Sequence, residues 1–153
     1  MLTINSIEKQ IQALPLAVQA PVKFGLEHCL IQLDRENQII NPSDRLIQSL
    51  AKVWCCSEFV AESCTRKPEL LVDLVHSGDL ESLYSEQTYQ NKLANLEIAD
   101  ESDLMVKLRQ LRRREMVRIA WRDLAGWAGL AETLLDLSLL ADACIQYALA
   151  YLY

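Results

Sequence analysis

A helical stripe that begins with leucines and continues with charged residues constrains this chain more than any other feature. At the spacing of one helix face, three leucines are followed by a glutamate and two arginines, in the order Leu104, Leu108, Leu111, Glu115, Arg118, Arg122. Ionised side chains are tolerated on a core-facing stripe only when they are paired and hydrogen-bonded. The segment therefore predicts either a buried ion-pair network or a docking surface for an anionic partner.

The same segment carries six arginines within fourteen residues, namely Arg109, Arg112, Arg113, Arg114, Arg118 and Arg122. We expect the first three to be solvated and the last two, with Glu115, to form internal ion pairs. In a second interpretation the helix is an interface. Arg114, Arg118 and Arg122 recur every four residues, and like charges at that spacing repel mildly unless an anionic partner lies over them. The sequence is compatible with both interpretations.

The composition favours helices joined by short turns. The 153 residues include 27 Leu and 15 Ala against 8 Val, with only 4 Gly and 4 Pro, and this balance is typical of helical rather than β-sheet proteins. A chain of this length fits one domain and can bury about 68 to 70% of its unfolded surface. We therefore predict one all-α domain over residues 1–153, built as a bundle of about six to seven helices.

Capping residues, prolines and glycines divide the chain into segments. Asn5 or Ser6 can cap a short first helix that ends at Pro15, and Gly78 can end a helix that follows Pro68. Ser57 can act as a new N-cap, so that either one helix kinks there or a second helix begins. Acidic residues from Asp100 onwards favour the start of the arginine helix. The expected longer helices span approximately 21–33, 46–56, 69–76, 86–96, 101–124 and 131–153.

A glycine turn connects the last two helices. Gly126 and Gly129 bracket this turn, so we expect the arginine helix and the final apolar helix to form a long antiparallel hairpin. In that hairpin Glu132 and Asp136 lie opposite the end of the arginine helix. They are therefore the candidate partners of Arg118 and Arg122.

Charge and cysteine content exclude several classes of protein. The formal net charge of −6 argues against a general nucleic-acid binder, which needs a basic surface. Five cysteines, an odd number without metal-ligand spacing, are typical of small buried hydrophobic residues in a reducing compartment. No apolar run reaches the roughly 18 residues that span a bilayer. We expect a cytoplasmic protein without a membrane partner.

The only acidic motif that resembles a metal site is SGDLE at residues 77–81. Two carboxylates follow a glycine at alternate positions, but the motif follows a helix, precedes no β-branched strand and lacks a third carboxylate. We interpret it as a helix C-cap followed by a polar turn, and His76 as part of the same helix end. The sequence offers no catalytic, cofactor-binding or metal-ligating residue.

The sequence RRREMVRIAWRDL at residues 112–124 resembles the N-terminal region of the bacterial glutamine synthetase adenylyltransferases, also called glutamate-ammonia-ligase adenylyltransferases or adenylyl-removing enzymes. Shorter segments resemble other parts of that region in the same order. These are SEFV at 57–60, KPELL at 67–71, SGDLE at 77–81, ETL at 132–134 and LAD at 140–142. The resemblance covers approximately residues 46–152.

The resemblance implies a large bifunctional enzyme that controls nitrogen assimilation through two nucleotidyltransferase domains. One domain attaches AMP to a tyrosine of glutamine synthetase, and the other removes it by phosphorolysis under the control of PII-type signal proteins. This chain would be the helical N-terminal part of the adenylyl-removing half. The motif for ATP and Mg²⁺ would lie downstream, in the neighbouring nucleotidyltransferase domain, so this piece would be inert alone and hold no cofactor. The alternative is a freestanding helical module that binds an acidic partner through the arginine helix.

Overall fold

The computed structural model describes residues 1–153 and contains helices and turns without any β-strand. Its elements are α1 (Ile4–Gln12), α2 (Leu16–Arg35), α3 (Asp44–Cys56), α4 (Glu58–Arg66), α5 (Pro68–His76), the 3-10 turn η1 (Asp79–Glu81), α6 (Glu86–Ala94), α7 (Glu101–Leu124) and α8 (Leu130–Leu152). The prediction of an all-α fold is confirmed. The number of α-helices is eight, more than the expected six to seven.

The extra helix comes from the break at Ser57. This residue ends α3 with an extended backbone, and its side-chain oxygen accepts a hydrogen bond from the backbone N–H of Val60 at 3.2 Å. A serine in this conformation satisfies one of the free N–H groups at the start of the next helix. The chain therefore forms two helices here, and not one kinked helix.

Two boundaries near the N-terminus differ from those expected. Thr3 caps α1 and forms a reciprocal capping box with Ser6, so Ser6 lies in the first turn rather than at the cap. Helix α2 begins at Leu16, directly after Pro15, and not at Pro21. Pro21 is exposed in the second turn of α2. The apolar pattern after Pro21 marks the buried face of α2 but not its start.

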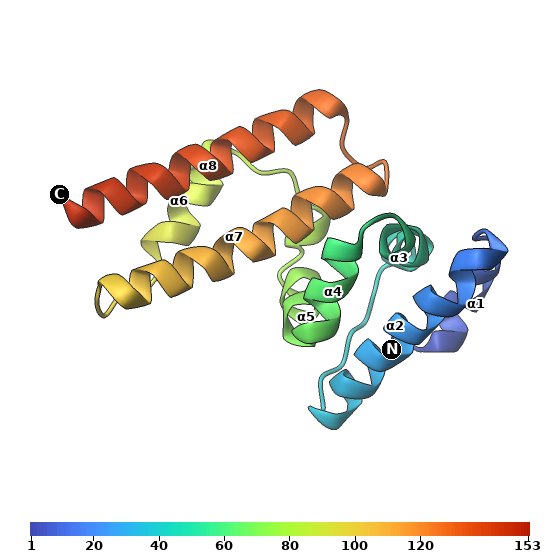
Figure 1. The fold of residues 1–153 in the computed structure, drawn as a ribbon. Coiled ribbons are helices and arrows are strands. Elements are labelled where there is room, and N and C mark those ends of the chain that lie inside the picture. Colours follow the sequence, from blue (N-terminus) through green and yellow to red (C-terminus); the bar gives the residue numbers. More distant parts are fainter.

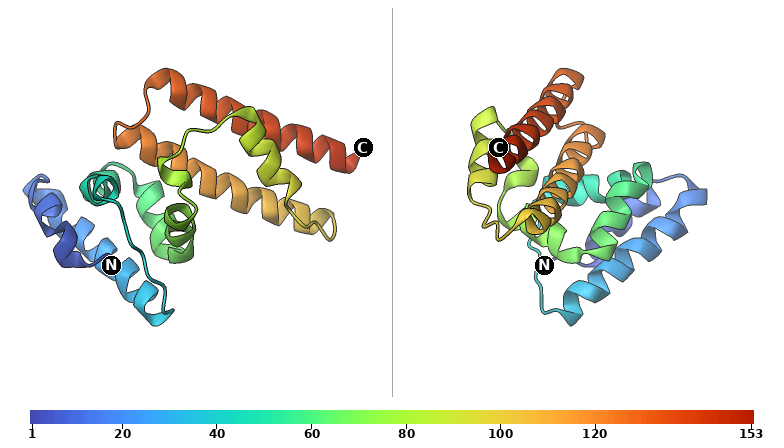
Figure 2. Two further views of the ribbon diagram at one scale, coloured as in Figure 1. Left: turned by 180° about the vertical axis from the view of Figure 1, so that it is seen from behind. Right: turned by 60° about the vertical axis from the view of Figure 1, so that its left-hand side comes forward.

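The helices form two groups that share α7. Figure 1 shows α7 and α8 side by side and antiparallel, with α6 packed against this pair, whereas α1 to α5 gather at the other side of α7. The left view in Figure 2 shows the same division, with the N-terminus beside α2 and the C-terminus at the free end of α8. The predicted long antiparallel pair is therefore the C-terminal part of the fold.

The larger group surrounds a cluster of 21 buried apolar residues, which come from α1 to α5, from one side of α7, and from Leu2, Ile40 and Leu80 outside these helices. Trp54 and Trp121 meet edge to face in this cluster, with ring centroids 5.7 Å apart. The indole N–H of Trp121 donates to the hydroxyl of Ser49 at 2.9 Å. Trp127 packs at its edge, under the guanidinium of Arg45. All three tryptophans therefore serve packing.

The smaller group, formed by α6, α7 and α8, has a cluster of only five buried apolar residues, Tyr89, Leu93, Ile119, Leu140 and Ala143. Much of the apolar surface of α8 is exposed, at positions that include Leu134, Ile145 and Leu149.

Helix α8 is long and apolar enough to cross a membrane by length and composition alone. This corrects the expectation that no segment has that character. The acidic residues of α8 interrupt its apolar run but do not outweigh it.

Candidate functional site

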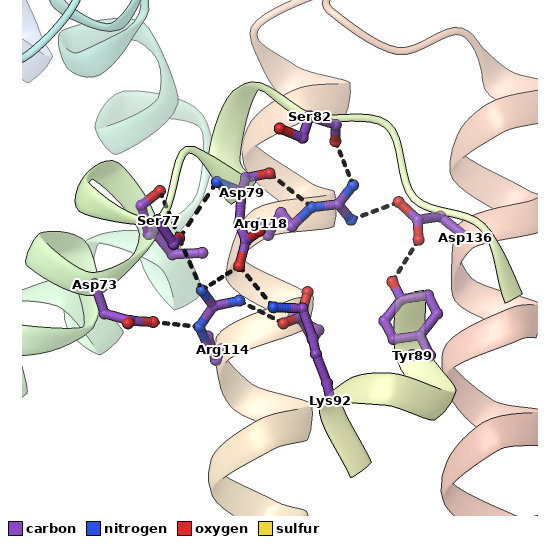
Figure 3. Close-up of polar contacts among 11 residues, drawn as sticks. Asp73, Ser77, Asp79, Ser82, Tyr89, Lys92, Arg114, Arg118 and Asp136 are labelled. Atoms are coloured by element: carbon purple, nitrogen blue, oxygen red, sulfur yellow. Dashed lines mark hydrogen bonds and ion pairs between the residues drawn. The ribbon is translucent and has the colours of Figure 1, made fainter. Parts of the chain in front are cut away.

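The charged stripe of α7 forms a buried network with α5, η1, α6 and α8, which we call the ion-pair site. Figure 3 shows its centre, where the side chains converge from these elements. Its charged and aromatic members are Asp73, Asp79, Tyr84, Tyr89, Lys92, Arg114, Glu115, Arg118, Arg122, Glu132 and Asp136. All six residues singled out from the sequence, Arg114, Glu115, Arg118, Arg122, Glu132 and Asp136, belong to it.

Arg118 is the central member and is completely buried. Its guanidinium donates to the carboxylate of Asp136 at 2.7 Å and to the backbone carbonyls of Asp79 and Ser82 at 2.9 and 2.7 Å. The ring of Tyr84 covers the guanidinium carbon at 3.4 Å from the ring centroid. All three nitrogens therefore have acceptors. This satisfaction is what makes a buried guanidinium tolerable.

Asp136 is the anion that neutralises Arg118. One carboxylate oxygen accepts from Arg118, and the other accepts from the hydroxyl of Tyr89 on α6. Burial and the neighbouring carboxylate of Asp136 raise the pKa of Tyr89 far above its usual range, so the phenol stays protonated and remains a donor. Helices α6, α7 and α8 are joined through this one carboxylate.

Arg122 connects the end of α7 to the start of α8. It donates to the carboxylate of Glu132 at 2.7 Å and to the carbonyl of Leu80 at 3.3 Å. The pairing is possible because α7 ends in a Schellman turn, in which Gly126 has a φ of 74° and Trp127 donates to the carbonyl of Arg122. The glycine turn sends α8 back along α7, which brings Glu132 next to Arg122.

Arg114 connects α7 to the end of α5. It donates to Asp73 at 2.5 Å, to Asp79 at 2.6 Å and to its neighbour Glu115 at 2.5 Å. Asp79 also accepts from Lys92 at 2.6 Å. Burial alone would raise the pKa of Asp79, but the hydrogen bonds from Lys92 and Arg114 outweigh it and lower that pKa to about 2.

Glu115 is the member whose charge is least well compensated. It is completely buried, and only one of its two carboxylate oxygens has a partner, which is Arg114. Burial raises the pKa of Glu115, although Arg114 and other nearby cations oppose the shift. The coulombic field of Glu115 in turn helps to raise the pKa of Arg114, against the effect of burial. Arg114 and Glu115 therefore have to be considered as one pair.

The SGDLE motif supplies acceptors to the arginines. Gly78 has a φ of 74° and follows the end of α5, so the motif is a helix end and a short 3-10 turn. The carboxylate of Asp79 is engaged by two cations, which leaves it poorly suited to ligate a metal. His76 does not cap α5, because its ring Nε2 lies 2.9 Å from the carbonyl oxygen of Ile39. Nowhere in the chain do three His, Cys, Asp or Glu side chains form a metal-binding group.

Several members of the site were not evident from the sequence. Asp73, Asp79 and Lys92 are charged residues without a distinctive spacing, and Ser82 and Leu80 contribute only backbone carbonyls. Lys92 pairs with Asp79, and the contacts of the other four with α7 join positions 35 to 42 residues apart. Only Gly78 indicates some of these acceptors in the sequence. It predicts a turn, and the backbone carbonyls of a turn are free to accept hydrogen bonds from side chains because no helix bond uses them.

The contacts of the ion-pair site are those of a structural network that holds helices in fixed positions. Its arginines donate to internal acceptors, and Asp79, Glu132 and Asp136 each accept from a cation. All five cysteines of the chain are free, and burial raises the pKa of Cys29 to about 12, which disfavours its nucleophilic thiolate. The arrangement fixes α7 and α8 relative to α5 and α6.

Comparison with known proteins gives the chain its family. Residues 47–153 match the family described as glutamate-ammonia ligase adenylyltransferase. The chain is similar to proteins named bifunctional glutamine synthetase adenylyltransferase/adenylyl-removing enzyme. The one from Nitrosococcus oceani is 43% identical over 148 residues, which are 95% of this chain and 15% of that protein. The one from Pseudomonas aeruginosa is 43% identical over 114 residues, which are 73% of this chain and 12% of that protein.

A third relative, from Thioalkalivibrio sulfidiphilus, is 45% identical over 112 residues, or 72% of this chain and 12% of the relative. The chain thus spans 12 to 15% of the length of these relatives. No solved structure matches it significantly. The matched region includes the whole of the ion-pair site, from Asp73 to Asp136. The chain therefore belongs to the glutamate-ammonia ligase adenylyltransferase family.

Proposed function

We propose that residues 1–153 are one helical N-terminal domain of an enzyme that adenylylates and deadenylylates glutamine synthetase, and that this domain belongs to the adenylyl-removing half. The names of the relatives support the overall activity. The small share of those relatives that the chain spans supports a role as one part of a larger enzyme. In that enzyme, ATP and Mg²⁺ bind to nucleotidyltransferase domains outside this chain, and a PII-type signal protein controls the balance of the two reactions in the cytoplasm.

The role of this part is to hold and present a rigid helical pair to the catalytic domain. The observation that carries this proposal is the ion-pair site, in which Arg114, Arg118 and Arg122 tie α7 to α5, η1 and α8. A buried pair that is well hydrogen-bonded, such as Arg118 and Asp136, fixes geometry more effectively than it adds free energy. The residues here therefore support catalysis elsewhere in the enzyme and carry out no step themselves.

The exposed side of α8 is the surface through which this domain contacts the catalytic domain. Leucine and isoleucine side chains are exposed towards both ends of the helix, at Leu130, Leu134, Leu135, Ile145, Leu149 and Leu152. Large exposed apolar side chains gathered on one element favour an interaction site on a folded protein. We propose that it packs against the nucleotidyltransferase domain of the same enzyme.

The experiment that tests the proposal is deadenylylation of AMP-modified glutamine synthetase in the presence of phosphate and Mg²⁺. We expect no activity from residues 1–153 alone and activity from the full-length enzyme. Release of ADP from the modified substrate is the readout. A full-length protein that folds and binds glutamine synthetase, yet neither adds nor removes AMP, would contradict the proposed activity. Activity of residues 1–153 alone would contradict the supporting role.

A further inference from the structure

Cations from two distant parts of the chain meet in a groove between the α4–α5 junction and α7. The groove has a volume of about 670 Å³, and its cations are Arg66 and Lys67 on one side and Arg109, Arg113 and Arg114 on the other. Glu69 and Asp73 also line it, and Asp73 pairs with Arg114, so five cations face two carboxylates and the lining keeps an excess of positive charge. We call it the basic groove. Its position is notable because the chain as a whole is acidic, with a net charge of −6.

Most of these cations have no strong internal partner. Lys67, Arg109 and Arg113 are exposed and take part in no ion pair. Arg66 pairs with Glu62 at 3.4 Å, and both side chains are largely exposed, so that pair is easily exchanged. Only Arg114 is fully committed to the ion-pair site. The groove therefore holds positive charge that an incoming anion can neutralise.

The basic groove continues into a second hollow that is partly apolar. This hollow of about 260 Å³ shares Arg109 and Arg113 with the groove and adds Arg112, Phe59 and Met116. Phe59 is 42% exposed, a large apolar side chain that nothing in this chain covers fully. From Val106, which lines the groove, to Met116, the surface follows ten residues of α7, or about 15 Å. A single small anion would occupy only part of this length.

We propose that the basic groove and the adjoining hollow bind an acidic polypeptide segment of a partner protein. Carboxylates of that segment would accept from the guanidinium groups of Arg109 and Arg113, whose planar forks fit carboxylates in two-point contacts. An apolar side chain of the same segment would rest against Phe59 and Met116. This interaction is independent of the catalytic assignment, since it needs only the surface of this chain.

The composition of the groove favours an acidic polypeptide over a nucleic acid. No aromatic side chain lines the basic groove, and Phe59 is the only one in the adjoining hollow, so successive nucleobases would find no row of stacking partners there. The net negative charge of the remaining surface repels an extended polyanion such as a nucleic acid strand. A short acidic segment makes few charged contacts and avoids most of that repulsion. Because the pairs would be exposed, we expect weak binding that depends strongly on salt.

The test is fluorescence polarisation with a labelled peptide of glutamates interspersed with leucines, titrated with the folded chain at low and at physiological salt. We expect the double variant Arg109→Glu/Arg113→Glu to bind about tenfold more weakly, as two attractive pairs become repulsive. The matched control is Arg35→Glu/Lys52→Glu, which makes the same change in net charge at exposed positions away from the groove. We expect the control to change the affinity less than about twofold at physiological salt, because distant charges are screened.

A second variant, Phe59→Ser, examines the apolar part of the proposal. It should weaken binding of the leucine-containing peptide and leave binding of a leucine-free polyglutamate unchanged. Equal losses in the groove and control variants would overturn the proposal, as would tighter binding of inorganic phosphate or of single-stranded DNA than of the peptide. Absence of peptide binding at low salt would also overturn it. If the glutamate variant proves poorly folded, Arg109→Gln/Arg113→Gln removes the same cations without adding repulsion, and a smaller loss that still exceeds that of the control is expected.

Discussion

Helices α1 to α5 surround a cluster of 21 buried apolar residues, whereas only five buried apolar residues join α6 to α7 and α8. The buried charged residues show the opposite distribution. Glu115, Arg118, Arg122 and Asp136 all lie on α7 and α8. Helix α7 takes part in both groups, since Val117 and Trp121 face the large cluster while Ile119 faces the small one.

The difference shows how a helical pair with little apolar contact can still have a defined position. Apolar burial is non-directional and is roughly proportional to area, so five residues give α8 little free energy of attachment. Hydrogen-bonded ion pairs are directional, and those of Arg118 and Arg122 fix the register of α8 on α7. We therefore expect the two groups to respond differently to substitution.

The largest effect is expected for Arg118→Met. Methionine fills similar space but leaves Asp136 buried with only the hydroxyl of Tyr89, and leaves the carbonyls of Asp79 and Ser82 without their donor. Breaking a buried pair in this way costs about 3 to 5 kcal/mol of unfolding free energy. Urea denaturation followed by circular dichroism measures it.

The matched control for this variant is Arg109→Met, on the exposed side of the same helix, where a change below about 0.5 kcal/mol is expected. The double variant Arg118→Met/Asp136→Leu should recover much of the loss, because no buried charge then remains unpaired. A charge exchange, Arg118→Glu/Asp136→Arg, should not recover it, since the glutamate would face the two backbone carbonyls. A cost below about 1 kcal/mol for Arg118→Met would show that the pair is not structural.

A somewhat smaller effect is expected for a cavity in the large cluster. Leu50 is completely buried there, and Leu50→Ala should lower the unfolding free energy by about 3 kcal/mol. The corresponding change in the small cluster, Leu140→Ala, should cost less, about 2 kcal/mol, because α8 is open on one side and can move into the space. The same denaturation experiment compares them. Equal costs would contradict the view that α8 is loosely packed.

The sequence predicts some helices and ion pairs of the molecule better than others. Helices α3, α5, α7 and α8 follow from apolar periodicity and from caps such as Ser43 and Asp100, whose side chains accept from the first turn. The pairs of α7 with α8 could be predicted because a short glycine turn relates the two helices by simple hairpin geometry. Arg122 and Glu132 are only ten positions apart.

The rest of the ion-pair site depends on long-range packing that periodicity does not report. Arg118 reaches the carbonyl of Ser82 across 36 positions, and Tyr89 reaches Asp136 across 47. These contacts require η1 and α6 to lie against α7, which follows from packing of the complete chain. Backbone carbonyls also carry no residue-type signal. The sequence therefore identified the buried arginines but only some of their acceptors.

An intermediate effect with a defined pH dependence is expected for Asp79→Asn. The folded pKa of Asp79 is about 2, below its ordinary 3.8, so its ion pairs stabilise the protein above about pH 4 and lose that contribution as the pH falls through 2. At pH 7 the variant should be less stable by about 1 to 2 kcal/mol, after allowance for solvent screening. The difference from the wild type should vanish towards pH 2.

Asp142→Asn is the matched control for that experiment, because Asp142 is an exposed carboxylate of α8 without an ion pair. Its effect should stay below about 0.5 kcal/mol at every pH. Denaturation between pH 2 and pH 7 gives both curves. A difference for Asp79→Asn that grows as the pH falls would mean that the carboxylate is destabilising when ionised, contrary to its two cationic partners.

The smallest effect on the isolated chain is expected on the open side of α8. Leu149 is 53% exposed, so Leu149→Glu should change the unfolding free energy of residues 1–153 by less than about 0.5 kcal/mol. In the full-length enzyme the same substitution places a charge in the proposed contact with the nucleotidyltransferase domain. An unpaired charge in an apolar contact is costly, so the longer protein should lose both thermal stability and deadenylylation activity.

Gln146→Glu is the control for this last comparison, since it adds the same charge to α8 at an exposed position whose side chain is already polar. Loss in the long enzyme for Leu149→Glu alone would show that the sparse packing of α8 is completed by another domain. Equal, small effects of both variants in the long enzyme would place the exposed stripe outside that contact. In that case the ion-pair site alone would have to hold α8 in position, and the cost of Arg118→Met should then be as large in the full-length enzyme as in residues 1–153.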